Sequence, residues 1–395
     1  MSDLVKRAKK VQSPVLGHYT ELEVVRGDGA YLYDKEDKAY LDFACGIAVT
    51  NLGHCHPAVV RAAKNQVETL IHNCAGVTYN ETNIKFCEDL LEVAPKDLDQ
   101  VFLCQSGSEA VEGCLKLARY VTKKAGIIAF QGGFHGRTLG ATSITSSKEK
   151  YYKPYEPLLP EVKILPRDLA EVEKIDFSEI GAVITELVTG EGGYFVQDKV
   201  FIQGLRKLCD ERGALLIFDE VQTGFGRTGK MFACEHFEVV PDVMALAKGI
   251  ASGFPLGAFL MKKKFSEQWS TGTHGGTYTG NLVACAAGSA NIREIKKLLP
   301  ILPDLAGKIK KDLENLAKKY SYHIKEIRGL GLMLAIDMGE AEKVKKMRMK
   351  ALEKGLLLIS CGPRDDAIRI IPPFIVTKNE IDKAIKILDE VLTSL

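Results

Sequence analysis

One lysine of the sequence stands in an unusual chemical setting. Lys248 lies in the apolar run Ala245-Leu246-Ala247-Lys248-Gly249-Ile250, and a lysine is rarely buried without a reason. Burial lowers the pKa of the amine and makes it nucleophilic, which is what a Schiff base with an aldehyde requires. The alternative interpretation is a structural lysine that reaches solvent from the end of a strand.

Two carboxylates follow a predicted buried strand upstream of this lysine. In Leu215-Leu216-Ile217-Phe218-Asp219-Glu220 the acids stand at the carboxyl end of an apolar run, where open α/β sheets place their ligand crevice. An unpaired carboxylate in a low-dielectric interior would take up a proton, so the chain or a ligand has to supply a cation. Alternatively, Asp219 caps a turn and Glu220 forms a salt bridge.

A third segment suits the binding of an anion. Gln105-Ser106-Gly107-Ser108-Glu109 lies between the predicted strand Val101–Cys104 and the predicted helix Glu109–Val121, where unpaired backbone N–H groups meet the positive end of a helix. The alternative is a simple helix N-cap at Ser108. Taken with Asp219 and Lys248, a phosphate-binding segment completes the three anchors of pyridoxal 5′-phosphate.

Two other motifs match ligand sites by spelling but not by context. The segment Gly224-Phe225-Gly226-Arg227-Thr228-Gly229-Lys230 contains both common glycine-rich nucleotide patterns. It does not open the helix of a first βαβ unit, and the residue that follows, Met231, has no hydroxyl for Mg²⁺. In His54-Cys55-His56-Pro57, adjacent side chains of an extended segment point to opposite faces, so a shared zinc ion is not expected.

The segments that would position these residues alternate between strand and helix patterns. From about residue 51 to 285, short β-rich runs are separated by amphipathic stretches, which is typical of a parallel sheet covered by helices. Several runs are apolar at nearly every position, as expected when both faces of the sheet are buried. The predicted strands are Val101–Cys104, Ile127–Phe130, Ala182–Leu187, Leu215–Glu220 and Leu256–Met261, with helices at Glu109–Val121 and Phe201–Arg212.

After Gly280 the sequence changes character. Lysine-rich helical segments at 304–319, 341–354 and 378–392 alternate with strand-like runs at 332–337, 356–359 and 368–371. We therefore predict an α/β fold with a large domain (51–285) built on a mostly parallel central sheet, and a smaller α+β domain (286–395). Residues 1–50, which contain the strand-like Tyr31-Leu32-Tyr33-Asp34, are predicted to pack with the small domain.

Composition and charge narrow the class of protein. The 395 residues are 46% hydrophobic and 26% charged, and 53 basic against 51 acidic residues leave a net charge of only +2. Disorder is excluded, and nucleic-acid binding is not expected to be the main function. The apolar runs are far shorter than the ~20 residues that span a bilayer. Without a signal-like amino terminus or any C-x-x-C pair, we expect a cytoplasmic location and reduced thiols.

The motifs as a set resemble the class III (subgroup II) pyridoxal-phosphate aminotransferases, particularly the 4-aminobutyrate and acetylornithine aminotransferases. The resemblance runs from Gly27 to the carboxyl terminus and implies fold type I of the pyridoxal-phosphate transferases. The matching motifs are Gly53-His54-Cys55-His56-Pro57, Ser106-Gly107-Ser108-Glu109-Ala110, Phe134-His135-Gly136-Arg137-Thr138, Asp219-Glu220-Val221-Gln222-Thr223-Gly224, Ala247-Lys248-Gly249 and Gly276-Thr277-Tyr278-Thr279-Gly280-Asn281.

The resemblance implies a role for each residue around the cofactor. Lys248 would be joined to the cofactor aldehyde and move the substrate proton, while Asp219 would pair with the ring nitrogen. Phe134 and Val221 would cover the two ring faces. Gln222 would reach the ring hydroxyl, and Gly107 and Ser108 would hold the phosphate. The implied cofactor-binding set is Ser106, Gly107, Ser108, Phe134, His135, Glu186, Asp219, Val221, Gln222, Lys248 and Thr277, of which Thr277 would reach the partner subunit's phosphate in a homodimer or higher homo-oligomer.

The resemblance also implies three substrate-binding residues. Arg137 would bind the substrate carboxylate distal to the reacting amine, and Arg369 would hold the α-carboxylate of glutamate or 2-oxoglutarate. Each guanidinium can grip a carboxylate through paired hydrogen bonds. Glu191 would neutralise Arg369 when an ω-amino substrate is bound. No metal ion belongs to this set.

Three positions depart from the family pattern. The family commonly has Pro and Gln at the places of Leu187 and Thr189, and Pro at the place of Leu282. These changes leave the cofactor residues intact but weaken any inference about the amine that is accepted.

We predict transamination of an ω-amino acid, with 2-oxoglutarate as the acceptor and an aldehyde and glutamate as the products. The segment between Pro166 and Glu186 resembles acetylornithine enzymes, whereas Tyr278-Thr279-Gly280-Asn281 and Ser360-Cys361-Gly362 resemble 4-aminobutyrate enzymes. The prediction leans to a 4-aminobutyrate-like donor, with N-acetylornithine or ornithine as the alternative. An amino-acid racemase or aminomutase on the same fold, and a silent cofactor-binding regulator, are the rival functions.

Overall fold

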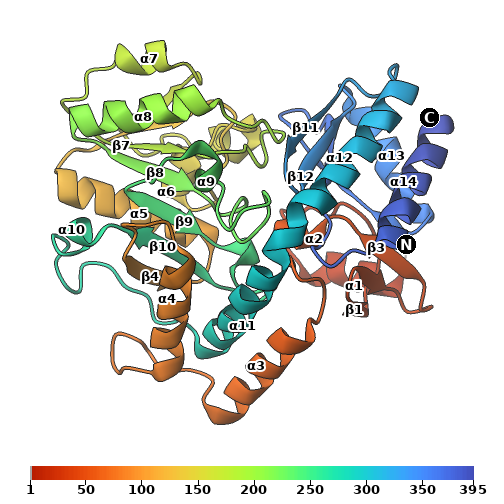
Figure 1. The fold of residues 1–395 in the computed structure, drawn as a ribbon, viewed down its shortest axis with the longest axis horizontal. Helices are drawn as coiled ribbons and strands as arrows, with labels where there is room; N and C mark the ends of the chain where they lie inside the picture. Colours follow the sequence, from red (N-terminus) through yellow and green to blue (C-terminus); the bar gives the residue numbers. More distant parts are fainter. Residues whose placement is uncertain (1) are drawn as a thin grey trace.

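The computed structural model describes residues 2–395 and is built around one large sheet. Seven strands lie in the order β4-β10-β9-β8-β7-β5-β6 (Figure 1). All neighbours in this sheet are parallel except at β10, which is antiparallel to both β4 and β9. The predicted mostly parallel sheet is therefore confirmed. Its strands are β4 (Gln100–Cys104), β5 (Gly126–Phe130), β6 (Val162–Leu165), β7 (Ile180–Thr185), β8 (Leu215–Asp219), β9 (Val243–Leu246) and β10 (Gly257–Met261).

The five predicted strands of this sheet are present with ends shifted by no more than two residues, whereas β6 and β9 were not predicted. The β6 segment is a four-residue edge strand that contains a lysine, Lys163, so its apolar pattern is interrupted. The β9 segment is short, and only Val243 among its residues is β-branched.

Both faces of the central sheet are buried, because successive side chains of a strand pack in hydrophobic clusters on opposite sides of the sheet. In β8, Leu215 and Ile217 pack in one hydrophobic cluster with residues of α5 (Gly107–Thr122), while Leu216 and Phe218 pack in another with residues of α8 (Lys199–Arg212). Successive side chains of a strand point to opposite faces, so a continuous apolar run is what a sheet covered on both sides requires.

The remaining strands form two smaller sheets. The first has the order β1-β2-β3-β13, and its parallel β3–β13 pair joins the N-terminal segment to the C-terminal part of the chain. The second has the order β11-β12-β15-β14 and is antiparallel. The strands are β1 (Arg26–Asp28), β2 (Tyr31–Tyr33), β3 (Ala39–Asp42), β11 (Glu326–Leu330), β12 (Met333–Asp337), β13 (Leu356–Leu357), β14 (Ile359–Cys361) and β15 (Ala367–Ile370).

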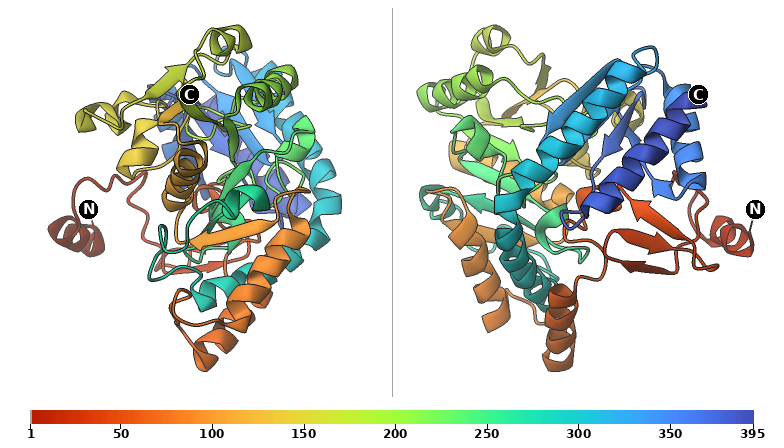
Figure 2. Two further views of the ribbon diagram at one scale, coloured as in Figure 1. Left: turned by 90° about the vertical axis from the view of Figure 1, so that its left-hand side faces the viewer. Right: turned by 45° about the vertical axis from the view of Figure 1, so that its right-hand side comes forward.

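Long helices surround the sheets, and α1 projects from the rest of the molecule at the N-terminus (Figure 2). The helix α11 (Leu282–Leu298) packs against α3 (Pro57–Thr69) and α4 (Glu81–Val93). The boundary that the sequence predicts at residue 285 falls inside α11, and the division into three domains stays a prediction. The further helices are α1 (Asp3–Val11), α2 (Cys45–Ala48), α3 (Pro57–Thr69), α4 (Glu81–Val93), α6 (Leu139–Ser143), α7 (Leu169–Glu173), α9 (Cys234–Phe237), α10 (Lys263–Ser266), α11 (Leu282–Leu298), α12 (Leu302–Lys319), α13 (Ala341–Glu353) and α14 (Lys378–Thr393).

The glycine-rich segment 224–230 forms hydrogen bonds that connect parts of the chain distant in sequence. Its Arg227 is fully buried and donates hydrogen bonds to the carbonyl oxygens of Pro372 at 2.7 Å and Leu332 at 3.2 Å. The same guanidinium donates to the side-chain oxygen of Asn51. The segment that spells a nucleotide motif thus has a structural role next to the central sheet.

The structure also bears on membrane insertion and on the state of the cysteines. Over residues 2–395, no helix combines the length and apolar character that crossing a bilayer would need. All ten cysteines are free thiols, and seven of them are buried. The seven buried thiols therefore contribute to the packing of the core.

We predict opposite stability effects for the same substitution in two helices. A Cβ on Gly113 of α5 would overlap the Phe259 ring of β10, whereas a Cβ on Gly307 of α12 meets no atom within 4 Å. Gly113→Ala should lower the free energy of unfolding by about 1–3 kcal/mol through overpacking, and Gly307→Ala should raise it by about 0.5–1 kcal/mol. Urea unfolding midpoints measure both, and a shift of both variants in one direction contradicts the prediction.

Candidate active site

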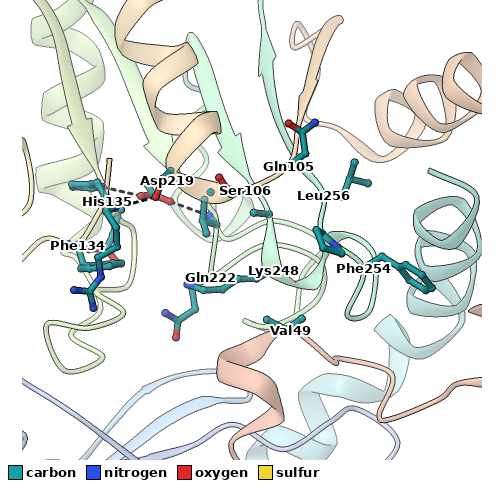
Figure 3. Close-up of a pocket in the computed structure, with 18 of the residues that line it drawn as sticks. Val49, Gln105, Ser106, Phe134, His135, Asp219, Gln222, Lys248, Phe254 and Leu256 are labelled. Carbon is teal, nitrogen blue, oxygen red and sulfur yellow. Dashed lines mark hydrogen bonds and ion pairs between the residues drawn. The ribbon is translucent and has the colours of Figure 1, made fainter. Parts of the chain in front are cut away.

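A cavity of about 320 Å³ lies beside the carboxyl ends of β4, β8 and β9 (Figure 3). This is the edge at which open α/β sheets bind ligands. The cavity brings together most of the residues that the sequence singled out. Those that line it are Ser106, Gly107, Ser108, Phe134, His135, Arg137, Glu186, Asp219, Val221, Gln222 and Lys248.

Asp219 is a buried carboxylate fixed from two sides. It ends β8 and is only 5% exposed. Its Oδ2 lies 2.8 Å from Nδ1 of His135, and its Oδ1 accepts a hydrogen bond from the backbone N–H of Val221 at 3.0 Å (Figure 3). These contacts hold the carboxylate in one orientation toward the cavity.

Lys248 follows β9 and lines the same cavity as Asp219. Its backbone is in the left-handed region at φ 47°, a conformation that is uncommon for a side chain other than Asn, Asp or His. Burial lowers the pKa of the Lys248 amine, and the charge of Asp219 opposes this effect only in part. Within residues 2–395 the amine forms no hydrogen bond or ion pair, so it is available to react with an aldehyde.

The helix α5 presents its N-terminus to the cavity. The N-cap is Ser106, whose Oγ accepts a hydrogen bond from the N–H of Glu109 at 3.2 Å; the alternative cap at Ser108 is therefore wrong, because the helix begins two residues earlier than predicted. Ser108 Oγ instead accepts from the N–H of Arg137 at 2.9 Å. A Cβ on Gly107 would lie 2.8 Å from Val221 Cγ1, so only glycine allows this close approach.

Two further side chains on the cavity wall are held by buried hydrogen bonds. The carboxylate of Glu186 accepts from the N–H of Phe134 at 3.0 Å and from the N–H of Gly190 at 2.8 Å. Burial nevertheless raises the pKa of Glu186. Gln222 accepts a hydrogen bond from the hydroxyl of Tyr194 at 2.6 Å. Both side chains are therefore oriented before any ligand arrives.

The two arginines differ in exposure. Arg137 is exposed at the rim, with its guanidinium 4.0 Å from the centre of the Tyr151 ring and 5.3 Å from that of Phe134. Arg369, on β15, is buried and forms an ion pair with Glu191. The Arg369 guanidinium lies 5.6 Å from the centre of the Tyr194 ring, and the hydroxyl of Tyr194 donates to Gln222 on the cavity wall. The ion pair therefore lies beside the cavity, although neither of its residues lines it.

Thr277 lies outside the cavity. It is exposed on the loop between α10 and α11, so the single chain does not bring it to the other predicted residues. The resemblance assigned Thr277 to a partner subunit, and that assignment stays a prediction. No group of three or more His, Cys, Asp or Glu side chains in the described chain is arranged to hold a metal ion.

Sequence reasoning missed two residues next to Glu191. The carboxylate of Glu191 contacts Lys148 and Tyr151, which lie in a polar segment without strand or helix periodicity. The only sequence signal was the mixture of lysine and tyrosine residues in the stretch 148–155, which suits a solvated loop equally well.

Comparison with known proteins places the chain in a family. The model of the family described as "Aminotransferase class-III" matches residues 13–392. The chain therefore belongs to the class-III aminotransferases.

Its relatives match it over nearly their whole length. The acetylornithine aminotransferase of Methanopyrus kandleri is 44% identical over 371 residues, which are 93% of this chain and 94% of the relative. The acetylornithine aminotransferase of Caldanaerobacter subterraneus is 44% identical over 382 residues, covering 94% and 95%.

Solved structures share the fold. An ornithine aminotransferase of Toxoplasma gondii, described with partial occupancy of pyridoxal phosphate at its active site, superposes with a TM-score of 0.90 at 28% identity, over 99% of this chain and 94% of that one. An ω-transaminase of Thermomicrobium roseum gives a TM-score of 0.92 at 26% identity, over 99% and 98%.

Class-III aminotransferases depend on pyridoxal 5′-phosphate, so the chain is a pyridoxal-phosphate-dependent transferase of fold type I. The donor set of the cavity fits this cofactor. A helix N-terminus suits the phosphate, a buried carboxylate suits the protonated ring nitrogen, and an amine with a lowered pKa suits the aldehyde.

We predict that Lys248→Ala abolishes both the absorbance band of the covalent lysine–aldehyde linkage and amine transfer. Without the amine, no covalent link to the aldehyde forms and no base moves the substrate proton, so turnover should fall by at least about 10³-fold. Absorbance spectra and a coupled assay measure the two effects. Lys263→Ala, which removes an exposed lysine paired with Glu267, is the matched control. Near-normal turnover of Lys248→Ala would refute the assignment.

Proposed function

We propose that the protein transfers the ω-amino group of an amino acid of the N-acetylornithine or ornithine type to 2-oxoglutarate. The observation that carries the proposal is the ion pair between the buried Arg369 and Glu191, beside the cavity that Lys248 lines, together with a second arginine, Arg137, at the rim of that cavity. Two guanidinium groups around one reactive amine suit a pair of substrates that carry carboxylates at different distances from the reacting atom.

The choice of donor differs from the one to which the sequence leaned. The lean toward 4-aminobutyrate rested on two short segments, 278–281 and 360–362. Relatives that are 44% identical over more than nine-tenths of the chain are named acetylornithine aminotransferases, and this favours the alternative. Overall identity samples many more positions than those two segments, and we therefore give it greater weight.

The reaction consists of two half-reactions at one site. The donor gives up its amine and leaves as an aldehyde, and 2-oxoglutarate takes the amine and leaves as glutamate. When bound, pyridoxal phosphate supplies the aldehyde that accepts the amine and a ring that stabilises negative charge at the substrate carbon. Asp219 would pair with the ring nitrogen of the bound cofactor and keep it protonated, since a buried carboxylate favours a cation beside it.

The side chains of the protein divide the remaining work. Lys248 Nζ takes the proton from the substrate carbon and returns it, as its lowered pKa allows. Arg137 binds the carboxylate of the donor. Glu191 neutralises Arg369 while the donor is present, and it leaves Arg369 when the α-carboxylate of 2-oxoglutarate arrives.

We predict that N-acetylornithine bleaches the absorbance of the cofactor-loaded enzyme faster than 4-aminobutyrate, with a kcat/KM at least about tenfold higher, a factor worth ~1.4 kcal/mol. A stopped-flow screen of N-acetylornithine, ornithine and 4-aminobutyrate measures this, and glutamate should appear only when 2-oxoglutarate is added. A faster reaction with 4-aminobutyrate would instead support 4-aminobutyrate as the amine donor, as the sequence analysis predicted. Conversion of one substrate without any 2-oxo acid would indicate an isomerase.

We also propose that the chain works as a homodimer in which Thr277 of each subunit completes the phosphate site of the other. The exposed position of Thr277, away from the cavity of its own chain, supports this. Light scattering should give twice the mass of one chain, and Thr277→Ala should weaken cofactor binding. A monomer with full activity would contradict the proposal.

A further inference from the structure

The carboxylate of Glu191 has two separate sets of partners. Its Oε2 pairs with Arg369. Its Oε1 accepts a hydrogen bond from the Lys148 ammonium group at 3.2 Å and another from the hydroxyl of Tyr151 at 3.0 Å. The second set belongs to a segment that follows α6, far in sequence from β15, which carries Arg369.

Lys148 is itself buried, and its ammonium group has a second carboxylate partner besides Glu191. Its side chain is 5% exposed, and its ammonium group lies 2.6 Å from Asp365 Oδ1. The same oxygen of Asp365 accepts a hydrogen bond from the hydroxyl of Ser360 at 3.1 Å. Burial opposes the charge of Lys148, but the carboxylates of Glu191 and Asp365 keep its pKa above the usual value. Lys148 therefore remains a fixed cation beside Glu191.

Glu191 carries a negative charge while it is paired with Arg369. Burial alone would raise its pKa, but the charges of Arg369 and Lys148 lower the pKa to about 2. In addition, the N–H of Gly362 donates a hydrogen bond at 3.0 Å to the backbone carbonyl of Glu191, which limits how far the residue can move. If a substrate carboxylate takes Arg369, the charge of Glu191 stays in the protein and needs another partner.

We propose that Lys148 is a positioning residue that, together with Tyr151, retains the Glu191 carboxylate while Arg369 binds the α-carboxylate of the 2-oxo acid. This inference rests on the proposed function. Lys148 acts through Glu191 and does not contact the substrate. The exchange of partners at Arg369 then leaves Glu191 with two of its three donors, so no buried carboxylate is left without one.

The proposal predicts an asymmetry between the two half-reactions. Without Lys148, moving Glu191 off Arg369 leaves a largely buried anion, its side chain 15% exposed, with a single hydroxyl donor. The incoming dicarboxylate has to offset that cost. The amine donor leaves the Glu191–Arg369 pair in place and meets no such cost. The loss of Lys148 should therefore weaken acceptor binding selectively.

The experiment uses the cofactor-loaded enzyme and the variant Lys148→Met. Calorimetry should show glutarate, a non-reacting dicarboxylate, binding at least about tenfold more weakly, a factor that corresponds to ~1.4 kcal/mol. The KM for 2-oxoglutarate should rise in parallel, while the KM for the amine donor changes less than about threefold. Lys153→Met is the matched control, because it removes an exposed lysine of the same segment whose ion-pair partner is Glu149 and not Glu191.

Two further variants separate this role from a purely structural one. Lys148→Arg should restore most of the affinity for glutarate, because it restores the charge. In a Glu191→Gln background, Lys148→Met should cause no additional loss of glutarate affinity, because residue 191, through which Lys148 acts, no longer carries a charge. If Lys148→Met does not fold, Tyr151→Phe removes the other donor to the same oxygen and should show the same asymmetry to a smaller extent.

The outcomes distinguish this inference from the function on which it rests. Equal weakening of donor and glutarate, no weakening of either, or a full effect of Lys148→Met in the Glu191→Gln background would overturn the role of Lys148 alone. If the unmodified enzyme binds no glutarate and transfers no amine to 2-oxoglutarate, the proposed function and this inference both fail.

Discussion

The site depends on one electrostatic constraint, a carboxylate buried at the carboxyl end of the central sheet. Asp219 has almost no contact with solvent, so its charge has to be balanced by its surroundings. The protein supplies His135 on one oxygen and the Val221 N–H on the other, and Lys248 lines the same cavity. In the proposed function, a cofactor with a protonated ring nitrogen would complete this balance, and Asp219 would favour the cationic form of that nitrogen.

The central sheet explains why these groups meet. Asp219 ends β8 and Lys248 follows the adjacent parallel strand β9, so residues 29 positions apart in sequence reach the same edge of the sheet. Because both faces of the sheet are covered, the strand ends are the places where a cavity opens to ligands. The N-terminus of α5 reaches the same edge, since α5 follows β4 directly.

The sequence predicts this central part well because its signals are local. Continuous apolar runs define the strands, and Asp219 and Lys248 stand out because charges are rare in such runs. Features that depend on how the folded chain packs leave no clear signal in the sequence. The cap at Ser106 rather than Ser108 depends on where α5 begins, and the short β9 has Val243 as its one β-branched residue. Lys148 is buried because Asp365 and Glu191 surround it.

The two buried charge clusters differ in a way that suits a reaction with two different substrates. Asp219 is fixed by a backbone N–H on one oxygen and by a buried histidine on the other. Glu191 instead shares its two oxygens between Arg369 on β15 and Lys148 on a loop beside the central sheet. A carboxylate with partners on both sides can give up one without becoming an isolated charge. In the proposed reaction, the Asp219 cluster would serve the cofactor, which is present in both half-reactions, and the Glu191 cluster would serve the two substrates, which bind in turn.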